Sequence, residues 1–250
     1  MIRQQLAESS VAAESLSRSF GADQAVGGVD LVVLPGEVHA VIGLNGAGKT
    51  TLMRLLLGML RPDSGRALIL GCDVRQADGD VWCRVGHLIE ARFGYPELTA
   101  AENLQAAGRL YGLSRAAAGP AAERLIERLR LTRWADRPAR ALSAGNRQRL
   151  GLGCAMICDP LVLILDEPIS GLDPAGVVLV RQLLNEAAVR GTAILLSSHH
   201  LDEMSRTADH IHVMHRGRLV GSLEPHGVDL ERRFFEMILA IDEAEPEPSR

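Results

Sequence analysis

The run Gly43–Thr50 constrains the fold of this 250-residue chain more than any other feature. It fits the pattern G-x-x-x-x-G-K-[ST] without a gap, and Lys49 is the one lysine among 27 basic residues. An apolar run at residues 38–42 precedes it, and a second at residues 51–57 follows it. A buried strand that runs into a helix is the setting that a phosphate-binding loop requires. The alternative is a chance match in a glycine-rich turn, and the two flanking runs argue against it.

Each residue type in this run suits contact with phosphate. The glycines let the backbone approach closely and aim its N–H groups at phosphate oxygens. Lys49 supplies a slim point charge where a forked guanidinium would fit poorly. Thr50 offers a hydroxyl to Mg²⁺, and the helix that follows directs its positive end at the anion.

Composition narrows the class of protein. With 47% apolar residues, the chain can bury the core of one domain, with room for a subdomain. The net charge of −4 gives no basic field that points to nucleic acid. No apolar stretch approaches the roughly 18 residues of a membrane span, and the first residues lack the apolar region of a signal peptide. We therefore expect a soluble chain that reaches a membrane only through a partner.

The four cysteines predict neither a disulfide framework nor a zinc site. Cys154 and Cys158 are four apart on a predicted helix and can share a face. Buried thiols are the expected interpretation, because no His or Cys pair adds ligands at metal spacing. A reducing, cytosolic setting fits this usage.

Alternating strands and helices predict an α/β sheet. Residues 29–33, 38–42, 161–165 and 193–196 are strand candidates, and the last three are the continuous apolar runs typical of strands covered on both faces of a parallel sheet. Between the last two lies a helix with Asp173 as its N-cap, Pro174 at its first position and Gly191 at its end. The first 42 residues otherwise suggest short strands and turns.

The middle of the chain is different, because residues from about 91 to 155 suggest helices. Thr99 and Glu102 form a capping box, and the pattern favours a helical insertion between two halves of the sheet. Residues 211–214 and 218–220 predict a hairpin. We assign residues 1–240 to one domain and expect the acidic, proline-bearing tail 241–250 to be disordered.

Two acidic residues, Asp166 and Glu167, end the apolar run 161–165. An acid at the end of a strand beside a phosphate loop is placed to hold Mg²⁺. Glu167 would point elsewhere because side chains alternate along extended backbone, and from there it reaches the water that attacks the γ-phosphate. The alternative is a pair of solvated acids that open a loop.

The segment Leu142–Gln148 precedes a predicted helix that stops before Pro160. Ser143 can cap this helix, and the free N–H groups with Gly145 form a second anion site. Such a site has no obvious use within one chain, but a second copy can present it across the γ-phosphate. An ordinary N-cap is the alternative.

Together these residues resemble the ATP-binding cassette (ABC) ATPases over nearly the whole chain. Gly43–Thr50 is similar to Walker A, Leu161–Glu167 to Walker B with its catalytic glutamate, Leu142–Asn146 to the LSGGQ signature, Ser170–Asp173 to the D-loop and Ser197–His199 to the switch-histidine loop. The signature departs at Ala144 and Asn146, which stand where the family has glycine and glutamine. Five elements in family order are more specific than any one motif.

The resemblance implies a RecA-like P-loop NTPase core with an N-terminal antiparallel β subdomain and an inserted helical subdomain. It implies Glu167 and His199 as catalytic residues, and Thr50, Glu90 and Asp166 as Mg²⁺ ligands. The implied nucleotide contacts are Phe20, Gly43, Leu44, Asn45, Gly46, Ala47, Gly48, Lys49, Thr50, Thr51, Ser143 and Gly145. Phe20 falls where the family stacks an aromatic on adenine, although a core phenylalanine fits the sequence nearly as well.

Glu90 is the clearest departure, because the family has glutamine at this position. A carboxylate is a stronger hard-oxygen ligand for Mg²⁺ than an amide. Glutamate here is similar to the subunits that export bacitracin-like or lantibiotic peptides. Neutral drift to another oxygen donor is the alternative.

We therefore expect an ATP-hydrolysing subunit that powers a separate membrane permease and exports an antibiotic, peptide or drug-like compound. By resemblance it works as a dimer, and we expect a homodimer that is cytoplasmic and peripheral on the inner face of the membrane. The export direction rests on overall resemblance, including residues 230–235. Alternatives are an importer ATPase, a soluble ABC ATPase that acts on nucleic acid or ribosomes, and a P-loop kinase or GTPase; the last explains neither Leu142–Asn146 nor His199.

Overall fold

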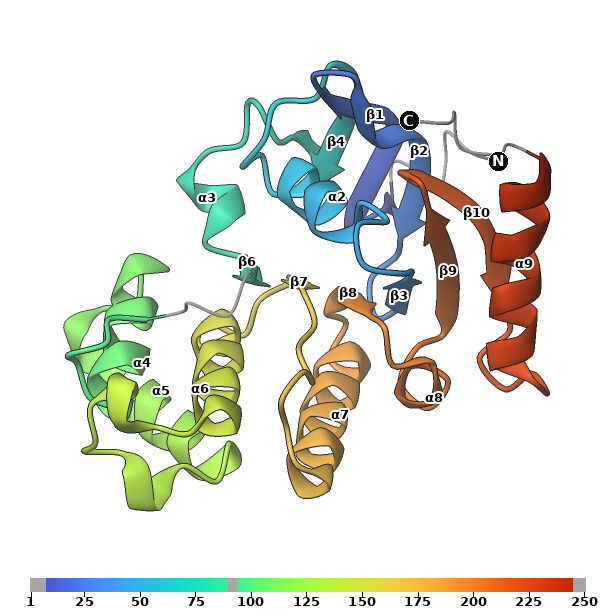
Figure 1. The fold of residues 1–250 in the computed structure, drawn as a ribbon. Helices are drawn as coiled ribbons and strands as arrows, with labels where there is room; N and C mark the ends of the chain where they lie inside the picture. Colours follow the sequence, from blue (N-terminus) through green and yellow to red (C-terminus); the bar gives the residue numbers. More distant parts are fainter. Residues whose placement is uncertain (1–7, 90–93, 245–250) are drawn as a thin grey trace.

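The computed structural model describes residues 8–89 and 94–244 of the chain, which fold around two β-sheets (Figure 1). The larger sheet has six strands in the order β10-β9-β3-β8-β7-β6. Its strands are β10 (Arg218–Leu223), β9 (His210–His215), β3 (Val38–Ile42), β8 (Ala193–Ser198), β7 (Val162–Leu165) and β6 (Val85–Leu88). All neighbours are parallel except the edge hairpin β9–β10. The predicted parallel sheet and the predicted hairpin are therefore confirmed.

The smaller sheet is antiparallel, in the order β2-β1-β4-β5. Its strands are β2 (Asp23–Val33), β1 (Val11–Phe20), β4 (Ser64–Ile69) and β5 (Cys72–Asp73). The expectation of short strands at the start of the chain is wrong, since β1 and β2 have 10 and 11 residues. Polar residues break each strand's apolar run, because both strands are only partly buried along their length.

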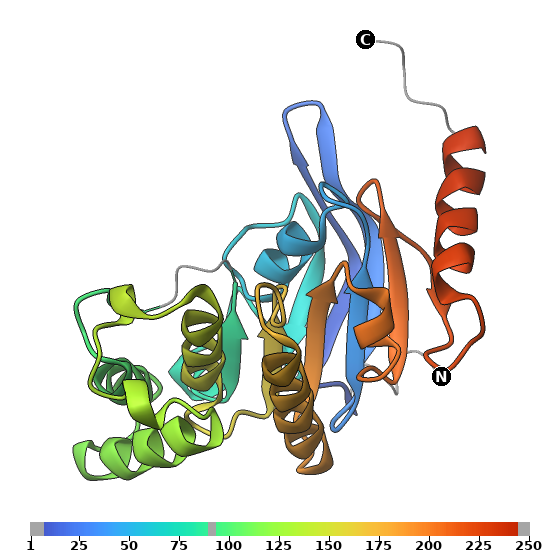
Figure 2. The ribbon, with the colours of Figure 1, turned by 60° about the horizontal axis from the view of Figure 1, so that its bottom comes forward.

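Two hydrophobic clusters fill the molecule, one on each face of the large sheet. Val41, Ile164 and Leu195 pack on one face with helix α2 (Lys49–Leu56) and the antiparallel sheet. The other face packs against α7 (Pro174–Val189) and α9 (Leu230–Ala244). Figure 2 shows the β1–β2 hairpin standing beside the large sheet with α2 next to it.

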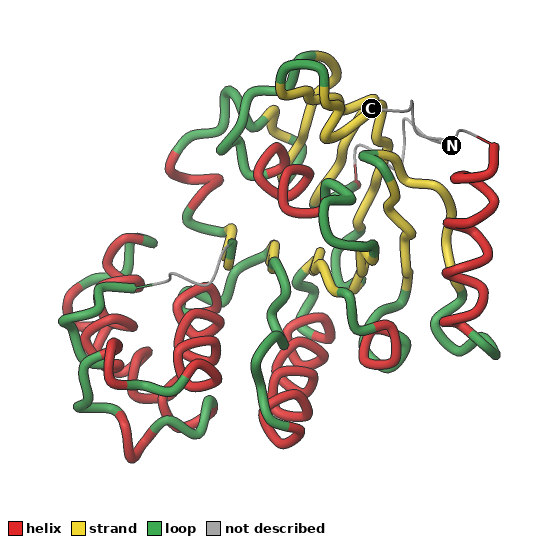
Figure 3. Tube along the Cα trace, viewed as in Figure 1, coloured by secondary structure: helices red, strands yellow, loops and turns green. Residues whose placement is uncertain are grey.

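Between β6 and β7, the regular elements of the described residues are helices joined by loops, as Figure 3 shows by colour. They are α4 (Ala100–Leu110), α5 (Arg115–Arg128), the 3₁₀ turns Thr132–Trp134 and Ala139–Ala141, and α6 (Ala144–Met156). We call residues 94–156 the helical lobe. The capping box at Thr99 and Glu102 is present with both of its hydrogen bonds. The helical character expected of this region is thus confirmed.

Two shorter helices complete the fold, α3 (Gly79–Trp82) and α8 (Leu201–Met204). α7 begins after its predicted N-cap Asp173, whose carboxylate accepts from the Gly176 N–H at 2.9 Å. Helix α9 continues to Ala244, so the prediction of disorder from residue 241 is wrong for residues 241–244. Those residues extend an amphipathic helix that buries Phe234 and Ile238, and the Asp242 carboxylate contacts His215 at 2.8 Å. Residues 245–250 lie outside the described part of the chain. Within the described ranges, no helix is both long and apolar enough to cross a membrane.

Candidate functional site

The phosphate-binding loop lies between β3 and α2, as predicted. Gly48 precedes the helix with φ of 104°, a left-handed conformation that favours glycine. A Cβ on Gly48 would lie 2.2 Å from the Ala25 carbonyl oxygen, and one on Gly43 would lie 2.3 Å from the Met214 carbonyl oxygen. Both glycines are therefore required by close backbone contacts with β2 and β9, which fix the path of the loop.

The Lys49 ammonium lies on the inner side of this loop and is buried. Its Nζ donates to the carbonyl oxygens of Gly43, at 2.6 Å, and Leu44, at 3.2 Å. Burial lowers the pKa of Lys49, and the nearby carboxylates of Glu167 and Asp166 oppose that shift. The one lysine of the chain is thus held between the loop and the acidic pair, where it can neutralise phosphate charge.

Thr50 and Asp166 meet although they are far apart in the sequence. The Thr50 hydroxyl donates to Asp166 Oδ2 at 2.6 Å, and the Ser197 hydroxyl donates to Asp166 Oδ1. A hydroxyl and a carboxylate oxygen side by side are the hard donors that Mg²⁺ prefers, so this pair fits the ion. The third predicted ligand, Glu90, lies outside the described residues.

Glu167 and His199 also meet, since His199 Nδ1 lies 2.9 Å from Glu167 Oε1. The second carboxylate oxygen, Oε2, is buried and has no hydrogen-bond partner among the described residues. A buried acceptor without a partner is costly, and a bound water or substrate group would satisfy it. A carboxylate with one oxygen held by a histidine can serve as a general base, and that role for Glu167 stays a prediction.

The direction of the Glu167 side chain has a different cause from the predicted one. We expected strand alternation to separate it from Asp166, but β7 ends at Leu165 and Glu167 has a left-handed φ of 50°. Such a conformation costs a non-glycine residue about 1–3 kcal/mol. The Ser197 hydroxyl accepts from the Glu167 N–H at 2.9 Å, and Gln148 Nε2 donates to the Glu167 carbonyl at 3.0 Å. These two contacts offset the strain.

Sequence reasoning placed Ser197 in the switch-histidine loop and Gln148 at the start of a helix, but it gave neither residue a contact with Glu167. The signal for Ser197 was its place at the end of the apolar run 193–196, beside the carboxyl end of the strand that carries Asp166. Gln148 offered no such signal, because it lies in the helical lobe and reaches the site only through the tertiary fold.

A cavity of about 420 Å³ opens beside the acidic pair, between the core and the helical lobe. It is lined by Leu88, Ala144, Arg147, Gln148, Asp166, Glu167, Ser170 and Gly171. The first turn of α6 and the loop after β7 therefore face the same space.

Comparison with known proteins agrees with this geometry. The profile of the family described as ABC transporter matches residues 26–170, which include the loop, the signature segment and the acidic pair. The chain belongs to the ABC transporter family.

Three curated relatives give the scale of this similarity. The daunorubicin resistance ATP-binding protein DrrA3 of Streptomyces coeruleorubidus is 38% identical over 86% of the chain and 68% of its own length. The Nod factor export ATP-binding protein I of Ralstonia nicotianae is 38% identical over 85% of the chain and 66% of its own length. The bacitracin transport ATP-binding protein BcrA of Bacillus licheniformis is 33% identical over 90% of the chain and 73% of its own length. The chain thus spans about two thirds to three quarters of these relatives.

Solved structures agree on the fold. One described as the ATP-binding subunit of an ABC transporter is 32% identical, with a TM-score of 0.79 over 91% of the chain and 93% of that structure. A dimeric bacterial ABC transporter cassette has the same TM-score of 0.79 at 20% identity, and it supports the fold alone. The predicted P-loop NTPase fold is therefore confirmed. The protein is an ABC ATPase that binds and hydrolyses ATP.

In the signature segment of this ABC ATPase, Leu142 is buried, whereas Ser143 and Ala144 are exposed. The Ser143 hydroxyl accepts from the Asn146 N–H at 3.2 Å, so Ser143 is the N-cap of α6, as predicted. Gly145 lies against the D-loop of its own chain, where a Cβ would be 3.3 Å from the Gly171 carbonyl oxygen. Ser143 and Gly145 are held by their own lobe and the D-loop, whereas Lys49 and Thr50 belong to the core. Their contact with phosphate stays a prediction.

Phe20 is a surface residue, so the alternative hypothesis that it packs in the core is wrong. It ends β1 with 48% of its area exposed, and the Arg18 guanidinium carbon lies 5.0 Å from its ring centroid. An exposed ring is free to stack on a base. The adenine contact itself stays a prediction.

Proposed function

We propose that this ABC ATPase powers a separate membrane permease that exports an amphipathic compound such as an antibiotic or peptide. The observation that carries the enzymatic part is the joint placement of Lys49, the Thr50–Asp166 pair and the Glu167–His199 pair at one edge of the sheet. The export part is supported by the relatives, which are named for daunorubicin resistance, Nod factor export and bacitracin transport.

The chemistry follows from these residues. The Lys49 ammonium neutralises charge on the β- and γ-phosphates. Thr50 and Asp166 would hold Mg²⁺, with Glu90 as a proposed third oxygen ligand, and the ion when bound would neutralise further phosphate charge. Glu167 accepts a proton from water as the water oxygen bonds to the γ-phosphorus. The bond between that phosphorus and the bridging oxygen breaks, and ADP and phosphate are released.

His199 has a positioning role in this scheme. Its Nδ1 contacts Glu167 Oε1, which leaves the buried Oε2 to accept the proton. His199 is half-exposed at 48% of its side chain, so its other ring nitrogen can reach a phosphate oxygen.

Dimerisation completes the site in this proposal. Ser143 is exposed and Gly145 is partly exposed, and they lie on the helical lobe rather than on the loop that carries Lys49. A second copy would bring the free N–H groups at the start of its α6 to the γ-phosphate. We expect a homodimer with two such sites.

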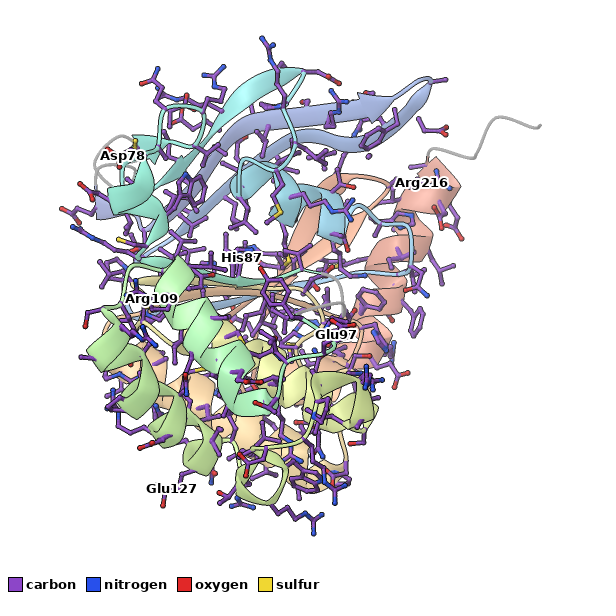
Figure 4. All side chains as sticks on the ribbon, turned by 90° about the vertical axis from the view of Figure 1, so that its left-hand side faces the viewer. Asp78, His87, Glu97, Arg109, Glu127 and Arg216 are labelled. Atoms are coloured by element: carbon purple, nitrogen blue, oxygen red, sulfur yellow. The ribbon has the colours of Figure 1, made fainter. Side chains whose placement is uncertain are left out.

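The permease has a candidate docking groove of about 420 Å³ between the helical lobe and α3. Its lining is Leu57, Met59, Trp82, Val85, His87, Ala107, Leu110 and Tyr111. Leu110 and Met59 are 78% and 48% exposed, which is unusual for large apolar side chains that gather in one place. Figure 4 shows His87 between α3 and α4. In the sequence, Glu90 follows β6 by two residues. In the family, the segment at this position faces the membrane partner.

Transport in membrane vesicles tests the proposal. The chain is co-expressed with a candidate multi-span permease, and ATP and Mg²⁺ are added to the medium around inside-out vesicles. We expect ATP-dependent accumulation of an amphipathic antibiotic, and no accumulation with Glu167→Gln. ATP hydrolysis without movement of any compound into the vesicles would contradict export.

A docking variant separates the permease from the nucleotide site. Leu110→Glu places a charge in the groove and should abolish co-purification with the permease while the chain still hydrolyses ATP. Val189→Glu is the matched control, because Val189 is 88% exposed at the end of α7 and lines no part of the groove. Equal co-purification of both variants would place the permease elsewhere.

If the partner were a nucleic acid instead of a permease, no compound would be transported. DNA or ribosomal RNA would then stimulate ATP turnover, although the net charge is −4. An importer ATPase would move its compound out of inside-out vesicles instead of into them.

A further inference from the structure

A cluster of histidines lies at the amino ends of β3 and β9, at the opposite edge of the sheet from the phosphate-binding loop. His39 is paired with His210 in the register of these parallel strands, and their ring centroids are 4.5 Å apart. Glu37 precedes β3 and completes the group. One ligand atom from each of Glu37, His39 and His210 lies within 4.8 Å of the other two.

The individual distances suit a small cation. His39 Nε2 lies 3.0 Å from Glu37 Oε2, and His210 Nε2 lies 3.9 Å from Glu37 Oε1. Ligand bonds of about 2.0–2.2 Å in a tetrahedron place neighbouring donors roughly 3.3–3.6 Å apart. The two distances end on different oxygens of Glu37, so a rotation of this carboxylate and of the exposed His210 ring would bring one oxygen and both imidazole nitrogens onto one ion.

His212 supplies the orienting contact that metal-binding histidines need. His39 Nδ1 lies 2.9 Å from His212 Nε2. Without an ion, the 3.0 Å contact with the Glu37 carboxylate needs the proton on His39 Nε2. Metal binding would move that proton to Nδ1, which would then donate to His212 Nε2 and leave the Nε2 lone pair for the ion. Ligating histidines usually donate their other ring N–H in this way, which fixes the tautomer.

The three ligands differ in how firmly they are held. His39 is buried with 4% of its area exposed, and the Glu37 carboxylate also accepts from the Leu34 N–H at 2.9 Å. His210 has 53% of its side chain exposed, so an ion has a path from solvent. Glu37 and His39 are therefore held in place before an ion binds, and the exposed side of His210 lets the ion enter.

We propose that Glu37, His39 and His210 bind one divalent transition-metal ion, with Zn²⁺ the best match. Imidazole and carboxylate donors suit Zn²⁺, whereas Mg²⁺ and Ca²⁺ prefer sites made of oxygen. Three protein ligands leave a fourth position for water. The ion would join the start of β3, the strand that carries the phosphate-binding loop, to the start of β9.

A zinc titration of the full chain without nucleotide tests this site. Competition with a chromophoric chelator gives the stoichiometry and dissociation constant for the parent, His210→Ala and Glu37→Gln. Both changes should keep the fold, because His210 is half-exposed and glutamine still accepts from Leu34 N–H; melting without zinc checks this. His226→Ala is the matched control, an exposed histidine in the turn before α9.

We expect the parent and His226→Ala to bind one Zn²⁺ per chain that raises the melting temperature. His210→Ala and Glu37→Gln should weaken that binding at least tenfold and lose the temperature rise. His212→Ala should weaken it about 10–100-fold, as expected for an orienting partner. Zinc binding that survives in His210→Ala, or a parent chain that binds no Zn²⁺, would overturn the proposal.

Discussion

The carboxyl edge of the large sheet and the start of α6 both face phosphate in the proposed function, but they are built differently. At the sheet edge, Asp166 and Glu167 follow a buried strand and are fixed by Ser197, while Lys49 is buried in its loop. At the start of α6, Ser143 is exposed and caps only its own helix. One region is assembled within the chain, and the other is presented outward.

This difference matches two functions: nucleotide binding and water activation within one chain, and contact with phosphate that forms only in the dimer. Groups that bind nucleotide and activate water must hold their geometry, so they lie just beyond the ends of buried strands, where hydrogen bonds from neighbouring segments fix them. A group that acts only when two chains close must remain exposed until then. We therefore expect damage to the sheet edge to remove binding or chemistry within one chain, and damage to the lobe to remove only what needs the second chain.

The largest effect should come from Glu167→Gln. Loss of a positioned general base lowers the rate by about 10²–10⁴-fold, while ATP still binds because the loop and Lys49 are unchanged. Single-turnover hydrolysis and light scattering measure both parts, and we expect a slow enzyme that accumulates as an ATP-bound dimer. Near-normal turnover would show that Glu167 is not the base.

Lys49→Ala should remove nucleotide affinity without unfolding the chain. ATP at roughly 100 times its dissociation constant stabilises the parent by about 2.7 kcal/mol. The variant should lose most of that thermal shift and keep its ligand-free melting temperature. An ATP-induced shift equal to that of the parent would place the nucleotide away from the loop.

Ser197→Ala tests whether the sheet edge is held together as described. The change removes the hydroxyl that donates to Asp166 and accepts from the Glu167 N–H, so the free energy of unfolding should fall by about 1.5–3 kcal/mol. Urea unfolding measures this, with Ser205→Ala as the control, because Ser205 is partly exposed and its hydroxyl donates to the nearby Asp202 carbonyl. Equal losses in both variants would mean that Ser197 has no special structural role.

Ser143→Ala gives the smallest effect on stability. Loss of an N-cap costs about 1 kcal/mol, and the thermal shift with ATP in the monomer should be unchanged. ATP turnover in the dimer should fall, since the hydroxyl is proposed to face phosphate of the other chain. Unchanged turnover at saturating ATP would leave Ser143 as a helix cap only.

The hydrophobic pattern of the sequence predicts most of the core but less of the candidate site. Buried parallel strands appear as continuous apolar runs, and the caps Asp173, Thr99 and Ser143 were correctly assigned from local chemistry. The long strands β1 and β2 were missed, because their partly exposed faces carry polar residues that interrupt the pattern. The helix past residue 240 was missed because its charge suggested disorder, while the contact that supports it, Asp242 with His215, is made across the fold.

Site residues were predictable where a motif fixes their spacing, as in Gly43–Thr50 and Asp166–Glu167. The backbone turn at Glu167 and its supports Ser197 and Gln148 come from three separate segments. No local pattern brings such segments together. The same limit applies to Glu37, His39 and His210, whose spacing in the sequence shows no metal motif.

Mixing two inactive variants tests the central claim that each ATP is hydrolysed by the core of one chain and the helical lobe of another. Glu167→Gln damages only the core. Ser143→Asp damages only the lobe, because aspartate at the exposed Ser143 position still caps α6 but its charge repels phosphate. A mixed dimer pairs the intact core of one variant with the intact lobe of the other. Since half of the dimers are then mixed and each has one complete site, we expect about a quarter of the parent ATPase rate. A mixture no more active than the two variants measured separately would contradict the account.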